Sequence, residues 1–496
     1  MRAFALLAAL FSLIPDAARA YGNTQCAGDR FGSDLVCSAN DVQITQMEVV
    51  SAPSSCNGGG TVTLDLRLTV NFGSASRYDP GIFLSNDGRD PQLTVANGGA
   101  TSCSVAVLPT TSPFLNLDPN GGTDTCGDGN SSINGGTGSG QIVMSNVTVT
   151  CQALNNGGGL YVPFVVSWDN QASPSGLTCN GIDDPVPNTK SKCNAPVVEL
   201  SPQVVVLPTI TKTDGKTQIT PGDTATYTVA ITNNTGVTLS TGNGNAALFQ
   251  DPAVSNLSVS SVTCAVTAGT ATCPSAGSVT VAAMQGAGIT IPSMANGSIV
   301  TFTVTAQLTG NPTGTLTNVA TVTSNGQTAS ASDADAIVYP SLVNVKSSTA
   351  LSDPFNGTTN PKRIPGAAVR YDVTVTNTGE GTVNADTVYI IDAIPDHTDL
   401  YVNDFGGAGS GPVAFSDGVP TSALTYTFSS LASTTDDVAF SNDGGVTYTY
   451  TPVPNGNGVD PNVTHLRINP KGTFAGDPVV GAPSPSCTAS FRVRIE

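Results

Sequence analysis

The chain has 496 residues, of which 53 are Gly, 33 are Pro, 11 are Cys, two are His and one is Trp. Charged residues make up only 11%, less than half of the usual share of about 25%. Long solvated helices are therefore excluded, because their outer faces need Lys, Glu and Arg. The formal net charge of −18 argues against a nucleic-acid partner, which would require a basic stripe. Composition predicts an all-β protein, and length predicts about three domains.

The first 20 residues have the pattern of a secretory signal peptide. Arg2 supplies positive charge, an apolar stretch follows at 4–14, and Ala18-Arg19-Ala20 forms a small-x-small cleavage site before Tyr21. The apolar stretch is too short to span a bilayer, and no later stretch is long enough. We therefore expect a secreted or cell-surface protein, passing through a periplasm in transit, with no transmembrane segment.

Cysteine usage agrees with export. Eight cysteines fall early in the chain: Cys26, Cys37, Cys56, Cys103, Cys126, Cys151, Cys179 and Cys193. They predict up to four disulfides, whose pairing the sequence does not decide. Cys264 and Cys273 are predicted to close a local loop. The total is odd, so Cys487, which has no partner in its own module, is predicted to be free or to form an intermolecular bond.

Strands are predicted wherever apolar and polar residues alternate, because successive side chains of a strand point to opposite faces. Runs of this kind occur at 62–72, 160–168, 300–308 and 491–495. Each is expected to form a strand that is buried on one face. Turn sequences such as NNGGG, SNDGG and NGNG punctuate the chain, and no stretch has a convincing helical period. The pattern favours β-sandwiches.

An internal repeat relates the segments 219–236 and 364–380 at a constant offset of 144 residues. The matched pairs are Pro221 with Pro365, Gly222 with Gly366, Tyr227 with Tyr371, Val229 with Val373, and Asn233 with Asn377. In each copy a Pro-Gly turn starts a strand and an Asn-containing turn closes it. The repeat predicts two copies of one module.

The motif PG-x₄-Y-x-V-x-x-x-N, with LTNVATVTS at 316–324, resembles the bacterial and archaeal surface repeat called "domain of unknown function 11". The resemblance implies immunoglobulin-like β-sandwiches in tandem on an exported envelope protein, and it implies no activity. It covers roughly 209–339 well and 343–496 less well. The Cys-rich front end lies outside it, and resembles leader domains that precede such repeats.

These observations predict a signal peptide at 1–20, a Cys-rich β-sandwich domain at 21–205, a repeat-family sandwich at 206–339 and a divergent second repeat at 340–496. The junctions lack long Gly/Ser runs, which favours a semi-rigid rod.

The last module differs from the second in one respect. FRVRI (491–495) is aligned by pattern with FTVTA (302–306), after which the second module continues into LTNVATVTS. One expectation is an exposed sheet edge that a partner strand completes, which would place a protein partner or self-assembly at the C-terminal module. The other is that inserted residues close the edge, and SNDGGVTYTYTP (441–452) has the pattern of a hairpin that would do so.

Calcium is the one cofactor that the sequence suggests. Several carboxylates lie in Gly-rich loops: Asp87, Asp90, Asp118, Asp124 and Asp128. Carboxylate and carbonyl oxygens are the ligands that Ca²⁺ prefers, although no EF-hand pattern is present. The alternative is that these residues form Asx turns, in which each carboxylate accepts hydrogen bonds from its own backbone.

Catalytic motifs are poorly represented. The only two histidines, His397 and His465, limit any Ser-His-Asp arrangement, and no G-x-S-x-G elbow is present. The adjacent pairs Asp183-Asp184 and Asp436-Asp437 are expected to form turns. Trp168 is expected to pack in the core; the alternative is a platform for a sugar ring.

Together these features favour a non-enzymatic exported structural or cell-envelope surface protein. The alternative is an adhesin or ligand-binding protein that uses the Cys-rich domain as its binding head, and a hydrolase is a distant third interpretation.

Overall fold

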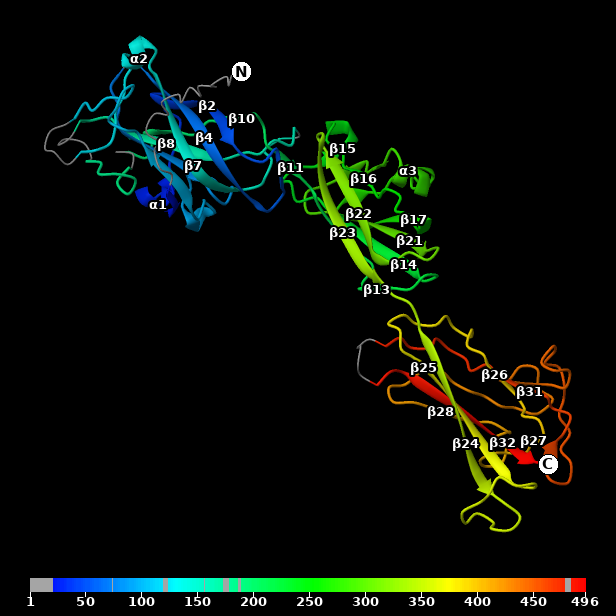
Figure 1. Ribbon diagram of the computed structural model, residues 1–496. Coiled ribbons are helices and arrows are strands. Elements are labelled where there is room, and N and C mark those ends of the chain that lie inside the picture. Colours follow the sequence, from blue (N-terminus) through cyan, green and yellow to red (C-terminus); the bar gives the residue numbers. More distant parts are fainter. Residues whose placement is uncertain are drawn as a thin grey trace, which may run out of the picture.

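The computed structural model describes residues 21–73, 75–118, 124–155, 157–172, 178–185, 189–477 and 483–496. The predicted signal peptide lies outside them. In Figure 1 the chain forms three successive lobes, each built from β-sheets. The all-β fold class is therefore confirmed. Among the described helices, none has the length and apolar character needed to cross a membrane.

The first lobe contains two large sheets, with strand orders β1-β6-β5-β8-β9 and β10-β2-β4-β7, and a small sheet β11-β3. Its strands are β1 (Tyr21–Thr24), β2 (Val42–Ser51), β3 (Ser55–Asn57), β4 (Thr61–Phe72), β5 (Tyr78–Ser85), β6 (Cys103–Val107), β7 (Ser139–Thr150), β8 (Phe164–Asp169), β9 (Cys193–Asn194), β10 (Leu200–Ser201) and β11 (Val205–Leu207). Its helical turns are α1 (Ala27–Phe31), η1 (Val95–Asn97) and α2 (Ile133–Gly136). β4 follows the predicted alternation, with every second side chain buried.

The run at 160–168 differs from its prediction in two respects. Its strand, β8, begins only at Phe164, and the strand is buried on both faces. Trp168 packs into the main core between the two sheets, as expected of a core residue. Val165 packs into a second, smaller core beside the Cys26–Cys103 disulfide. Alternation of apolar and polar residues in the sequence of β8 could not reveal that disulfide-linked segments cover the outer face of this strand.

The second lobe contains one sheet with the order β12-β14-β21-β17, a second with the order β13-β23-β22-β16-β19, and a small sheet β15-β20-β18. Its strands are β12 (Thr209–Thr213), β13 (Gln218–Ile219), β14 (Thr224–Thr232), β15 (Leu239–Ser240), β16 (Leu248–Gln250), β17 (Leu257–Ala268), β18 (Ala271–Thr272), β19 (Ile289–Thr290), β20 (Ser293–Met294), β21 (Ile299–Leu308), β22 (Gly314–Ser324) and β23 (Gln327–Ile337). Its helical turns are η2 (Thr241–Asn243), η3 (Ala276–Ser278) and α3 (Val281–Gln285).

The third lobe contains a sheet with the order β24-β25-β32-β27-β30, in which β28 also pairs with β32, and a sheet β26-β31-β29. Its strands are β24 (Leu342–Ser352), β25 (Ala368–Asn377), β26 (Ile390–Ala393), β27 (Thr398–Tyr401), β28 (Ala414–Asp417), β29 (Val438–Ser441), β30 (Val459–Asp460), β31 (His465–Ile468) and β32 (Ser486–Ile495). A core that includes Phe440, Phe474 and Phe491 lies between the two sheets.

The repeat seen in the sequence is also present in the backbone. Gly222 and Gly366 both have a positive φ, of 94° and 88°, in the turn that precedes the repeated strand. Asn233 and Asn377 are both buried, and each Nδ2 donates to two backbone carbonyl oxygens of its own lobe. These turns therefore have the same physical basis in the two lobes.

Strand register corrects one part of the sequence alignment. Tyr227 lies opposite Val304 in the second lobe, and Tyr371 lies opposite Phe491 in the third. Phe491 therefore corresponds to Val304, and its alignment with Phe302 is two residues out of register. A shift of two residues keeps the same side chains on the inner face, so alternation alone does not reveal it.

Direct contacts join successive lobes. Between the first and second lobes, Ala153 N–H donates to Thr235 O over 2.7 Å, and Ser54 Oγ lies 3.1 Å from Gln327 Oε1. Between the second and third lobes, Gln218 Nε2 lies 3.4 Å from a carboxylate oxygen of Glu380.

Candidate functional site

Three carboxylates from distant parts of the sequence meet in the first lobe: Asp79, Asp118 and Asp128. All three residues are buried, and one oxygen from each lies within 4.8 Å of the others. Two ligands of one Ca²⁺, each about 2.4 Å from the ion, lie no more than about 4.8 Å apart. The spacing is therefore that of a site for a single cation.

Within this group, Asp79 has the fewest hydrogen bonds to offset the energetic cost of burying its carboxylate. Both of its side-chain oxygens are buried without a hydrogen-bond partner in the described part of the chain. Its backbone N–H donates to Asp128 Oδ1 over 3.0 Å, and Leu117 N–H donates to Asp128 Oδ2 over 2.5 Å. Asp128 thus connects β5 to the 115–118 segment. Because an unpaired buried carboxylate is costly, Asp79 requires either a proton or a cation.

The electrostatics of the group point the same way. Burial raises the pKa of Asp79 to about 9, and the charges of Asp124, Asp118, Asp128 and Asp169 add to this. Burial also raises the pKa of Asp128 to about 7 and lifts the pKa of Asp124 above its ordinary value. Several carboxylates in one place repel each other when ionised, and either bound protons or a divalent cation relieves this repulsion.

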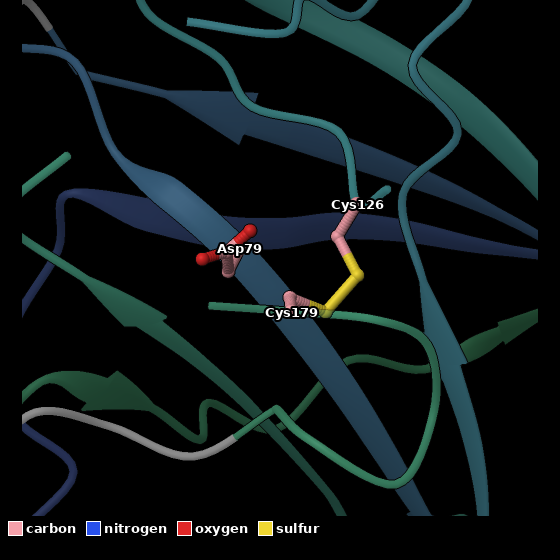
Figure 2. A group of neighbouring side chains, drawn as sticks. All are labelled: Asp79, Cys126 and Cys179. Carbon is pink, nitrogen blue, oxygen red and sulfur yellow. A yellow bond between two sulfur atoms is a disulfide. The ribbon is translucent and has the colours of Figure 1, made fainter. Parts of the chain in front are cut away.

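Figure 2 shows the Cys126–Cys179 disulfide beside Asp79. These sulfur atoms are bonded to each other, and a metal ligand must be a thiolate, so they do not count as ligands. The disulfide fixes the acidic loop instead. Thr125 N–H donates to Cys179 O over 2.9 Å, and Cys179 N–H donates to Asp124 Oδ2 over 3.5 Å.

Two of the residues predicted as calcium ligands, Asp87 and Asp90, do not join this group. The Asp87 carboxylate accepts hydrogen bonds from Ser85 Oγ, from Arg89 N–H and from the backbone and hydroxyl of Thr101. Although burial opposes the change, these bonds lower the pKa of Asp87. Asp90 accepts in the same way from Gln92. The structure thus places Asp87 and Asp90 apart from Asp118 and Asp128, and the carboxylates of Asp87 and Asp90 organise turns.

The sequence reasoning missed Asp79. It lies in β5, far along the chain from Asp118 and Asp128, and no spacing pattern connects them. Its one local peculiarity is a left-handed backbone conformation, with φ of 52°, which is not visible in the sequence.

A second acidic group, also missed, lies in the second lobe and contains Asp214, Asp333 and Asp335. Asp335 is fully buried, and neither of its side-chain oxygens has a hydrogen-bond partner among the described residues. Burial raises the pKa of Asp335 to about 6, with Asp214 and Asp333 adding to the effect and Lys216 opposing it. These residues lie on β23 and in the loop after β12.

The cysteines of the first two lobes are paired. The disulfides are Cys26–Cys103, Cys37–Cys193, Cys56–Cys151, Cys126–Cys179 and Cys264–Cys273. Cys487 is a free, buried thiol on β32. Burial raises its pKa to about 12, with a contribution from Asp417. An intermolecular disulfide at Cys487 would require this strand to open.

The residues considered for catalysis occupy structural positions. His397 is exposed, with Nδ1 3.7 Å from Glu496 Oε2, and His465 begins β31. The Asp437 carboxylate accepts from the backbone and hydroxyl of Thr427. Asp184 accepts from Asn180 N–H over 2.7 Å. These carboxylates organise loops, as expected.

No family model matches the chain, and no curated protein matches its sequence. The resemblance to "domain of unknown function 11" therefore remains without support from a family model.

Several solved structures match the chain at low TM-scores and low sequence identity. The C-terminal domain of the Streptococcus agalactiae AgI/II polypeptide BspA is 11% identical, with a TM-score of 0.24, and the match covers 58% of this chain and 92% of that one. The C-terminal domain of the Streptococcus pyogenes antigen I/II-family protein AspA is 14% identical, with a TM-score of 0.24 and coverages of 58% and 91%. BcpA, the major pilin subunit of Bacillus cereus, is 12% identical, with a TM-score of 0.21 and coverages of 66% and 89%. Similarity at this level does not identify a shared function.

Proposed function

We propose that this protein is a non-enzymatic, exported structural component of a cell surface or extracellular assembly, built as a semi-rigid rod of β-sandwiches. The observation that carries the proposal is the repetition of one set of three adjacent strands, β12-β14-β21 in the second lobe and β24-β25-β32 in the third, with Gly222/Gly366 and Asn233/Asn377 in equivalent turns. Tandem copies of one stable unit make a spacer. The direct contacts at Ala153 and Gln218 support the proposal that neighbouring lobes have limited freedom to move relative to each other.

The arrangement of polar residues supports the non-enzymatic part of the proposal. Catalysis requires a nucleophile or acid–base pair that faces a site where a substrate atom can sit. The histidines and paired carboxylates considered above serve turns and strand ends. The disulfides of the first lobe and the predicted signal peptide support an oxidising, exported location.

The alternative function is adhesion, with the first lobe as a binding head. Its support is that this lobe has its own sheet arrangement, four of the disulfides and the Asp79 group, and so differs from the repeats.

Lysine cross-linking of the native protein on its source cells, followed by fractionation, separates the two functions. Exposed Lys190 reports on the first lobe and exposed Lys362 on the third. A structural component is expected in the envelope or an extracellular assembly, with cross-links to a protein partner at Lys362. Cross-links concentrated at Lys190 would favour the adhesin. Recovery as an uncross-linked monomer in the medium would contradict both.

We also propose that Asp79, Asp118 and Asp128 bind Ca²⁺ and thereby stabilise the first lobe. The support is the ligand-like spacing and the two unpaired oxygens of Asp79. A ligand that binds only the folded state raises its stability, by about 2.7 kcal/mol at a hundredfold excess over Kd.

Trp168 is the only tryptophan and is fully buried in the first lobe, so its fluorescence reports the unfolding of that lobe. Its thermal transition is expected at a higher temperature in millimolar Ca²⁺ than in excess chelator. Asp79→Asn should abolish this difference, whereas the turn variant Asp90→Asn should keep it. Equal transitions with and without Ca²⁺ in the unmodified protein would mean that the carboxylates share protons instead.

A further inference from the structure

A groove of about 740 Å³ runs along the third lobe between β24 and β26. Its lining includes the apolar side chains of Leu342, Val375 and Ile390, and the charged pair Lys346 and Asp392. β24 is the edge strand of one sheet, and β26 is the edge strand of the other. The groove therefore lies where the two sheets of the sandwich are open along one side.

The same place in the second lobe is filled. The counterpart of β26 is β16, which pairs with β19 on one side and with β22 on the other. β26 pairs with β31 on one side, and no described strand pairs with its other side. β22 and β23 form a hairpin that also contacts β12, the counterpart of β24. The groove therefore lies at the position that the β22–β23 hairpin occupies in the second lobe, and no described strand of the third lobe fills that position.

Side-chain exposure shows the consequence. In β12, the inward-facing Ile210 is only 9% exposed because the hairpin covers it. Leu342 of β24, which lines the groove, is 47% exposed, and Ile391 on β26 is 57% exposed. Large apolar side chains that gather on an unpaired edge mark an interaction site.

The segment that the sequence suggested as an internal closure does not fill the groove. In 441–452, Tyr450 forms an isolated bridge with Phe440, which lies in β29. β29 pairs with β31, on the side of the sheet away from the open edge of β26. Tyr450 Oη also donates to Asp460 over 2.8 Å, which holds this loop in place.

We propose that the groove between β24 and β26 receives an extended segment of a partner protein, which adds to the free edge of β26 as β22 adds to β16. The inference deepens the proposed structural function and rests on it. Partner recognition by strand addition uses backbone hydrogen bonds for affinity and alternate side chains for specificity.

The second lobe indicates the chemistry of this segment. In β22, the inward positions are Leu316, Asn318, Ala320 and Val322, and the outward positions are mainly Thr. The partner segment should therefore alternate small or aliphatic residues with hydroxyl residues over about ten positions. Burial lowers the pKa of Lys212, and the negative charges of Asp251 and of Asp333 in β23 oppose this effect. An acidic residue in the partner would have the same relation to Lys346.

The experiment uses a fluorescently labelled synthetic peptide with the sequence of residues 314–337, titrated into the full chain. Saturable binding of one peptide per chain is expected. A second peptide, with Asp in place of Leu316, Ala320 and Val322, is the matched control and should not bind. Equal binding of the two peptides would overturn the proposal.

Chain variants locate the binding. Ile391→Lys, at an exposed residue of the groove, should weaken peptide binding at least tenfold. Val446→Lys, at a residue of the same lobe that is 80% exposed and outside the groove, should leave binding unchanged. If the two variants bind the peptide equally, it has entered elsewhere, for example by displacing the hairpin of the second lobe, and the proposal fails.

Sedimentation of the chain without peptide completes the test. A monomer is expected. A dimer that Ile391→Lys abolishes would make a second copy the occupant and would overturn the assignment to another protein. A negative result in these experiments leaves the envelope location untouched, because cross-linking on cells tests that separately.

Discussion

Lys346 of the third lobe is the structural counterpart of Lys212 of the second. Lys212 lies opposite Val229 and Lys346 opposite Val373, and these two valines are matched in the repeat. Each Nζ contacts an aspartate, Asp251 at 2.5 Å or Asp392 at 2.6 Å. The Lys212 side chain is 0% exposed and the Lys346 side chain 38% exposed, because only the second lobe has the β22–β23 hairpin.

This difference predicts unequal effects of the same substitution. Lys212→Met leaves Asp251 buried without its partner and should lower the free energy of unfolding of the second lobe by about 3–5 kcal/mol. Lys346→Met breaks a pair whose lysine remains in contact with water and should cost less, about 1 kcal/mol. Denaturant unfolding followed by far-ultraviolet circular dichroism measures both. Similar losses for the two variants would mean that the hairpin does not shield Lys212.

The second lobe should also lose stability as pH rises, because of Asp335. Its pKa in the folded protein is about 6, raised by burial and by Asp214 and Asp333, whereas Lys216 opposes the rise. The folded state therefore holds a proton that the unfolded chain releases at lower pH, so this stabilisation is complete below about pH 4 and is lost as pH rises through 6.

The substitution Asp335→Asn tests this prediction. It should flatten the dependence between pH 4 and 7 and raise the thermal transition of the second lobe at neutral pH. Asp223→Asn, at a half-buried residue in the turn before β14, is the control. A transition of the unmodified protein that rises with pH over this range would show that Asp335 is ionised throughout.

Disulfides that enclose longer segments should contribute more stability. Cys37–Cys193 spans 156 residues and Cys264–Cys273 spans nine. Loop entropy assigns up to about 5 kcal/mol to the first and about 2.5 kcal/mol to the second. Double substitution to Ala at each pair, followed by denaturant unfolding, compares them, with Trp168 fluorescence for the first lobe. A larger loss for the Cys264–Cys273 pair would contradict the entropic account.

Cys487 should be unreactive in the folded protein. It is buried and its thiol pKa is raised to about 12, so the thiolate that reacts with reagents is scarce. A thiol-specific chromogenic reagent should detect little reaction in native buffer and one thiol per chain in denaturant without reductant. Fast reaction in native buffer would show that β32 is accessible, and that an intermolecular bond there is feasible.

Alternation and the repeat predicted the framework of the fold well. The period of two at 62–72 and 300–308 corresponds to β4 and β21, and the turns at Gly222 and Gly366 are equivalent. The limits of these signals are physical. A period of two cannot detect a register shift of two, which misplaced Phe491, and it cannot show that the second face of β8 is covered.

The acidic site was only partly predictable. Asp118 and Asp128 are close in sequence and in space, whereas Asp79 joins them only through the packing of β5. Asp87 has the same loop composition as Asp128, yet its carboxylate is fully used by Thr101 and its neighbours. Composition does not distinguish a carboxylate that its own turn satisfies from one that is left unpaired.

The central structural claim is that the third lobe is the same sandwich as the second without the covering hairpin. Amide hydrogen exchange of the full chain tests it most directly, because unpaired edge amides exchange quickly. Slow exchange is predicted for β16, which is paired on both sides, and exchange faster by at least tenfold for the free edge of β26. Equal protection of these two strands would contradict the account, since it would show that the groove is already closed.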